Sequence, residues 1–197
     1  LSSLPATADE LQNIGRFLGA PQSSIILGSD ASETEVKRRD LKKHRILVFA
    51  THGLTAGERY GLDEPALALT PGTKDDGILT ASEISQLKLD ADWVILSACN
   101  TAAGQDEKSE GLSGLARAFL YAGSRALLVS HWPVETKSAQ KLTVGIFKQL
   151  RSQPLIGRAE ALRRSIAALA ESGDELHFSH PAFWAPFVLV GDGLGGT

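Results

Sequence analysis

The stretch ADWVILSACNTAAG, residues 91–104, decides how the rest of the chain is interpreted. It contains a continuous apolar run at residues 93–96, which stops at Ser97, shortly before Cys99. Continuous apolar runs of this length are typical of strands that are covered on both faces of a sheet. Similar runs lie at residues 46–49, 126–129 and 187–190, and a shorter candidate strand lies at residues 24–27.

Helical patterns lie between these runs. Apolar residues recur at helical spacing in residues 10–18, 112–120, 142–150 and 156–169. Strands that alternate with helices predict an α/β fold with a mostly parallel central sheet and helices on both faces.

The segment at residues 53–85 has a different composition, rich in Gly, Pro and Asp. We expect it to form loops and a small hairpin, because these residues favour turns. Near its end, Thr80 and Glu83 have the spacing of a capping box, which predicts that a short helix starts at Thr80.

Size and composition fit one globular domain over residues 1–197, since 43% of the residues are hydrophobic and 22% are charged. The net charge of −3 gives no electrostatic reason to expect nucleic acid or an anionic membrane as a partner. No apolar run approaches the roughly 20 residues that span a bilayer.

The single cysteine cannot form an internal disulfide, so we expect a cytoplasmic location. The sequence starts at Leu1 and contains no methionine, so we expect it to be part of a larger protein.

Two chemically active side chains follow two of the predicted strands. His52 and Gly53 come after the run at residues 46–49, and Cys99 comes after the run at residues 93–96. The carboxyl ends of parallel strands meet at one edge of a sheet, where the catalytic groups of open α/β proteins gather. A Cys99 thiolate is a nucleophile, and a neighbouring His52 can accept its proton. The N–H groups of Gly53 and Cys99 can form an oxyanion hole.

The alternative is that Cys99 is a small buried residue with a role in packing only.

Several motifs, in this order along the chain, resemble the CHAT domain. They are ILVFATHG, LTASEISQLKLDADWVILSACNTAAG, EGLSGLARAFLYAGSRALLVSHWPV and HPAFWAPFVLVGDG, and with the segment LPATADE they cover nearly the whole chain. The CHAT domain is a caspase-like module that is related to separases and often follows tetratricopeptide repeats in bacterial proteins. The resemblance implies a three-layer caspase-like sandwich and a catalytic dyad of His52 and Cys99. The spacing of these two residues is close to the roughly 50 residues found in caspases.

The resemblance also implies what is bound. We expect a protein or peptide substrate, a repeat region of the parent chain as a partner, and neither a cofactor nor a metal. In caspase-like enzymes the loop after the strand at residues 126–129 lines the substrate pocket, so His131, Trp132 and Glu135 are candidate substrate-binding residues. The alternatives are that His131 packs structurally and that Glu135 favours the start of a helix near Thr136. In this family a strand normally precedes the LPATADE segment, and we expect that first strand to be missing from this sequence.

Two hypotheses about function follow. In the first, the chain is a cysteine endopeptidase with Cys99 as the nucleophile and His52 as the general acid and base. In the second, it is a latent or non-catalytic interaction module of a repeat-containing regulatory protein. A nucleotide-binding α/β domain is disfavoured because the sequence has no phosphate-binding loop.

Overall fold

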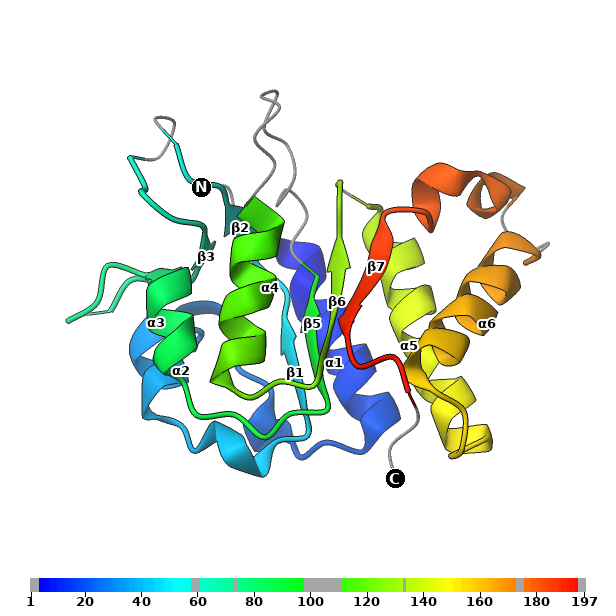
Figure 1. Ribbon diagram of the computed structural model, residues 1–197, viewed down its shortest axis with the longest axis horizontal. Helices are drawn as coiled ribbons and strands as arrows, with labels where there is room; N and C mark the ends of the chain where they lie inside the picture. The colour runs from blue at the N-terminus through cyan, green and yellow to red at the C-terminus, as the bar shows by residue number, and fades with distance from the viewer. Residues whose placement is uncertain are drawn as a thin grey trace.

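The computed structural model describes residues 4–57, 61–72, 74–97, 111–132, 134–172 and 176–194. Within these ranges the α-helices are α1 (Pro5–Leu18), α2 (Glu33–Arg38), α3 (Ala81–Gln86), α4 (Gly111–Ala122), α5 (Thr136–Ser152) and α6 (Arg158–Ala170). The strands are β1 (Ile46–Phe49), β2 (His52–Leu54), β3 (Ala66–Ala68), β4 (Ile78–Thr80), β5 (Trp93–Leu96), β6 (Ala126–Ser130) and β7 (Phe187–Gly191). The strands form two sheets. The larger one has four strands and lies between layers of helices, and the smaller one has three strands (Figure 1).

The main sheet has the strand order β1-β5-β6-β7. β5 pairs with β1 on one side and with β6 on the other, and both pairings are parallel, in agreement with the mostly parallel sheet that the sequence predicts. β7 pairs antiparallel with β6, so the sheet is mostly parallel and has one antiparallel strand at its edge. The four long apolar runs are therefore strands of one sheet.

Alternate residues of the central strands face two separate cores. On one side of the sheet, Val94 and Leu96 pack with α3 and α4, including the fully buried Phe119. On the other side, Trp93 and Ile95 pack with α1, α5 and α6. Figure 1 shows α3 and α4 on one side of the sheet and α5 and α6 on the other. The three-layer arrangement is thus confirmed, and burial on both faces explains why the strands are apolar at every position.

Local sequence determines where several helices begin and end. α1 stops because Gly19 takes the left-handed conformation, with a φ of 69°. α3 begins after Thr80, whose side chain forms the predicted capping box with Glu83. α4 stops before Gly123, where a φ of 111° and the nearby Leu89 carbonyl leave no room for a side chain.

The four helices expected from periodicity are present. The structure starts α1 at Pro5, earlier in the chain than the sequence indicates, and it adds α2, which the sequence does not predict.

The smaller sheet has the order β2-β3-β4, and both of its strand pairs are antiparallel. Leu67 in β3 and Leu79 in β4 are fully buried and belong to the same core as α3 and α4. The sequence predicts loops and a small hairpin here, whereas the structure has three paired strands. Since β2 begins at His52, this sheet fixes the backbone of the predicted catalytic histidine.

The prediction of a shorter strand at residues 24–27 is wrong. Gln22–Ser24 form a 3-10 turn, and Ile25 and Leu27 are extended but pair with no strand among the described residues. The physical reason is that β1 is the edge of the main sheet, and an extended segment becomes a strand only when a neighbour lies within hydrogen-bonding distance. Residues 25–27, α1 and β1 instead line a groove of about 1030 Å³.

Candidate active site

The carboxyl ends of β1 and β5 lie side by side. Phe49 pairs with Leu96 at the last position of the two strands, and the Ser97 N–H donates to the Phe49 carbonyl oxygen at 2.9 Å. His52 follows Phe49 by three residues, and Cys99 follows Leu96 by three residues. Cys99 itself lies outside the described residues. The described backbone brings the segment that leads to His52 next to the segment that leads to Cys99.

His52 and Gly53 are the first two residues of β2. Opposite them in β3 lie Ala68 and Leu67. The Thr51 hydroxyl donates to the Ala68 carbonyl oxygen, which ties the turn between β1 and β2 to the smaller sheet. Gly53 is buried, whereas His52 is half-buried and lines the groove beside β1. A half-buried imidazole at a groove can exchange protons with a bound substrate.

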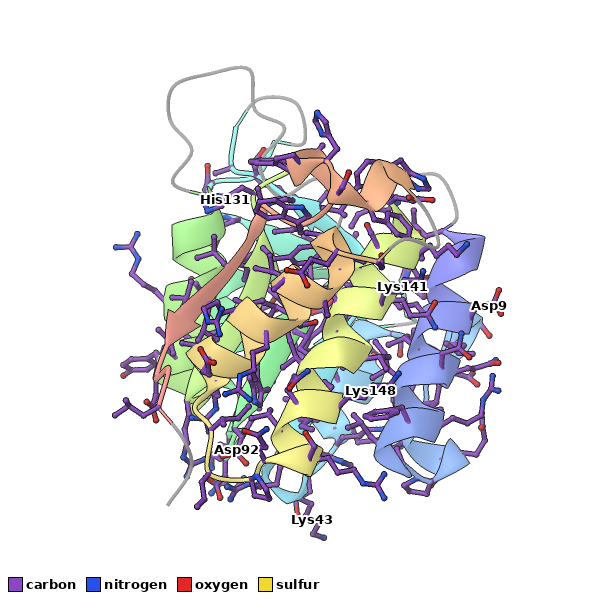
Figure 2. All side chains as sticks on the ribbon, turned by 90° about the vertical axis from the view of Figure 1, so that its right-hand side faces the viewer. Asp9, Lys43, Asp92, His131, Lys141 and Lys148 are labelled. Carbon is purple, nitrogen blue, oxygen red and sulfur yellow. The ribbon has the colours of Figure 1, made fainter. Side chains whose placement is uncertain are left out.

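Two of the predicted substrate-binding residues follow β6 directly. His131 is exposed, and its N–H donates to the Pro186 carbonyl oxygen at 3.0 Å. Trp132 is 42% exposed, and its indole N–H donates to the Ala182 carbonyl oxygen at 3.3 Å. Because β6 is parallel to β5, these residues lie at the same edge of the sheet as His52, with β5 between them. Figure 2 shows His131 at this end of the molecule.

The third of these residues, Glu135, precedes α5, which begins at Thr136 as the sequence predicts. Its side chain makes no capping hydrogen bond at the start of the helix. Instead, its Oε2 lies 3.4 Å from Nε2 of His177, and both side chains are about half exposed. The structure thus pairs Glu135 with a histidine that the sequence does not connect to it.

A buried carboxyl near the end of β5 is not predicted from the sequence. Glu10 of α1 is 2% exposed, and its Oε1 accepts a hydrogen bond of 2.6 Å from the Ser97 hydroxyl. Burial raises the pKa of the Glu10 carboxyl to about 7, and the hydrogen bond from Ser97 lowers it in part. The only available signal is helical spacing, since Glu10 stands one turn before Ile14, which is buried in the core.

In the part of the chain that the structure describes, no helix combines the length and the apolar character that crossing a membrane requires. In the same residues, no group of three or more His, Cys, Asp or Glu side chains could hold a metal ion.

A mostly parallel sheet between two helical layers, with polar residues at the carboxyl ends of its central strands, is the architecture of a caspase-like α/β protein. The family model of the CHAT domain matches residues 1–192. The chain therefore belongs to the CHAT domain family, as the motifs in its sequence predict.

Two curated proteins are similar to part of the chain. The mouse tetratricopeptide repeat protein 28 is 35% identical over 119 residues, which is 58% of this chain and 4% of the mouse protein. The human tetratricopeptide repeat protein 28 is 32% identical over 119 residues, again 58% of this chain and 4% of the human protein. The chain thus matches a small part of these relatives, and that part lies in proteins named for tetratricopeptide repeats.

Proposed function

We propose that this chain is a caspase-like cysteine endopeptidase that uses Cys99 as its nucleophile and His52 as its general acid and base. The observation that carries the proposal is the parallel pairing of β1 with β5, which ends at Phe49 and Leu96. Two strands that end side by side deliver the residues that follow them to a common edge. Membership of the CHAT domain family supports the same class of chemistry.

The proposed chemistry is acyl transfer to sulfur followed by hydrolysis. His52 takes the proton of the Cys99 thiol, and the thiolate attacks the carbonyl carbon of the scissile peptide bond. The C–N bond breaks, His52 returns the proton to the leaving amine, and the acyl group remains on sulfur as a thioester. Water then hydrolyses the thioester with His52 as the base. In this scheme the N–H groups of Gly53 and Cys99 stabilise the oxyanion.

We propose that the substrate is a protein or peptide that lies across the carboxyl edge of the sheet. Trp132 supports this, because an exposed indole at that edge offers a large apolar surface to a substrate side chain. His131 and Glu135, which lie close to Trp132 in sequence, are proposed to contribute polar contacts.

The test is cleavage of a natural substrate by the complete parent protein and by three variants. Cys99→Ala and His52→Ala should each abolish cleavage, and the double variant should be no worse than either single one, because residues that act as a unit have non-additive effects. The matched control is His44→Ala, which removes a histidine that precedes β1 instead of following it. It should leave cleavage unchanged. Full activity in Cys99→Ala would refute the assignment.

The alternative is a latent or non-catalytic interaction module. If the wild-type parent protein cleaves nothing under activating conditions and its Cys99 alkylates only on unfolding, this alternative becomes the better account. For either function we propose that residues 1–197 act as one domain and that repeats of the parent chain are its partner region. The similarity to tetratricopeptide repeat proteins supports this partner.

A further inference from the structure

Ser97 is the last described residue before Cys99, and two hydrogen bonds fix it. Its N–H donates to the Phe49 carbonyl oxygen of β1 at 2.9 Å, and its hydroxyl donates to Oε1 of Glu10 at 2.6 Å. The side chains of Trp93 and Ile95 face the same core as α1, and Ser97 continues their alternation along the strand. Its hydroxyl therefore points toward the helix that carries Glu10.

The carboxyl of Glu10 is not needed for packing. Glu10 is 2% exposed, on the same face of α1 as the buried Ile14, and an apolar residue there would pack without burying a titratable group. Phe17 and Leu18 already attach α1 to the core that contains β5. Within the described part of the chain, the one hydrogen bond of this carboxyl goes to Ser97, the residue after the central strand, and that contact suggests a role other than packing.

We propose that Glu10 is a positioning residue, which fixes Ser97 and thereby the direction in which the chain leaves β5 toward Cys99. The proposal rests on the proposed role of Cys99 as the nucleophile. Its second part is that loss of the Glu10 proton alters this arrangement, so that the reactivity of Cys99 depends on the protonation of a residue in the first helix.

The environment of Glu10 supports the second part. Burial raises the pKa of its carboxyl to about 7 and so favours the protonated form in the folded chain, whereas the hydrogen bond from Ser97 favours the carboxylate. When the proton leaves near neutral pH, a charge is created in a buried site, and the hydrogen bond from Ser97 then goes to a carboxylate instead of a neutral carboxyl, so the arrangement changes.

Other titratable side chains lie on the elements around Glu10. They are Asp9 and Arg16 on α1, Lys137, Lys141 and Lys148 on α5, and His52 after β1. Among the described residues none of them contributes to the shifted pKa of Glu10, which comes from burial and from Ser97. Figure 2 shows that Asp9, the neighbour of Glu10 on α1, points away from the molecule. Within the described part of the chain, the raised pKa of Glu10 therefore depends on its burial and on Ser97.

The experiment measures the rate at which iodoacetamide alkylates Cys99 in the complete folded chain between pH 5 and pH 9. Mass spectrometry of the peptide that contains Cys99 gives the rate at this residue. The variants are Glu10→Gln, Ser97→Ala and Ser97→Thr, and the matched control is Asp9→Asn, which removes the exposed acid next to Glu10 on the same helix.

The wild-type profile should show, besides the ionisation of the thiol, a second inflection near pH 7. In Glu10→Gln this inflection should disappear. The ratio of the wild-type alkylation rate to the Glu10→Gln alkylation rate should therefore change by about fivefold between pH 6 and pH 8, which is the lower end of usual couplings between sites. Ser97→Ala should lose the inflection as well, and it leaves the packing of α1 intact. Ser97→Thr, which retains the hydroxyl, and Asp9→Asn should keep it.

The proposal is overturned if Glu10→Gln and Ser97→Ala both keep the wild-type profile, or if Asp9→Asn also loses the inflection. The result is distinct from the test of peptidase activity. An inflection that depends on Glu10 in a chain that cleaves nothing supports the positioning role and refutes the peptidase. Cleavage without any dependence on Glu10 or Ser97 refutes the positioning role alone.

Discussion

Replacing Glu10 by glutamine should change how the stability of the chain depends on pH. Glutamine has nearly the same shape as glutamic acid, and its carbonyl oxygen can still accept the hydrogen bond from Ser97. What it removes is the proton that the buried carboxyl binds. The wild-type chain and the variant should therefore have similar free energies of unfolding at low pH and different ones above neutral pH.

The magnitude follows from the pKa of the carboxyl. In the folded chain the pKa of Glu10 rises from its ordinary value of 4.5 to about 7, so the folded state binds the proton more tightly than the unfolded state. Between these two values the wild-type free energy of unfolding falls as the pH rises. At about 1.4 kcal/mol for each pH unit, the total loss is about 3 kcal/mol, and it is complete above pH 7. Glutamine does not titrate, so Glu10→Gln should gain this amount over the wild type across the same window.

Urea unfolding followed by the fluorescence of the three tryptophans measures the difference. Wild type, Glu10→Gln and the control Asp9→Asn are compared at pH 5, 6, 7 and 8, and all other titrating groups are common to the three chains. Asp9 is exposed, so Asp9→Asn should follow the wild type. If the Glu10→Gln and wild-type free energies stay parallel over this range, the carboxyl titrates normally in the folded chain and the reasoning from burial is wrong.

Three further outcomes are expected. Leu96→Ala should lower the free energy of unfolding by about 2–5 kcal/mol, because Leu96 is 2% exposed in the core that the sheet forms with α3 and α4, and chemical denaturation measures this loss. Thr80→Ala should lower the free energy of unfolding by about 1 kcal/mol in the same assay, because it removes the Thr80 side chain, which forms the capping box of α3 with Glu83. Ser82→Ala, at an exposed position in the first turn of α3, serves as the comparison. Gly53→Val should slow peptide cleavage by the parent protein, because a branched side chain obstructs the approach of a carbonyl to this backbone; unimpaired turnover would remove Gly53 from the proposed oxyanion hole.

The layers of the fold are predictable because strands that are buried on both faces have continuous apolar runs in the sequence. β5 and β6 are covered on both faces, so residues 93–96 and 126–129 are apolar throughout, and right-handed crossovers then place parallel strands side by side. The direction of β7 is not predictable in this way, because an apolar run fits a buried strand of either direction. Its direction depends on the path of the chain from α6 through the 3-10 turns Leu176–Ser179 and Pro181–Phe183.

The candidate site is predictable only where it depends on strand ends. His52 and Ser97 follow β1 and β5, and both positions are visible in the sequence because they come after the points where apolar runs stop. The bond between Glu10 and Ser97 joins residues 87 positions apart, and helical spacing indicates only that Glu10 faces the core. Which residue it meets there depends on how α1 lies on the sheet, and no local pattern encodes that.

The position of α1 in the chain has a consequence for how the protein is made. α1 is the first helix of these residues to be synthesised, yet its Phe17 and Leu18 belong to a core to which later elements, including α5 and α6, contribute many of the buried residues. A ribosome adds about 5–20 residues each second, so on the order of ten seconds pass between the synthesis of α1 and that of α5. An isolated helix of 14 residues is only marginally stable in water, and during this interval the apolar face of α1 has no partner in these later elements. A nascent chain that stops before residue 152 therefore lacks part of the surface on which its own first helix rests.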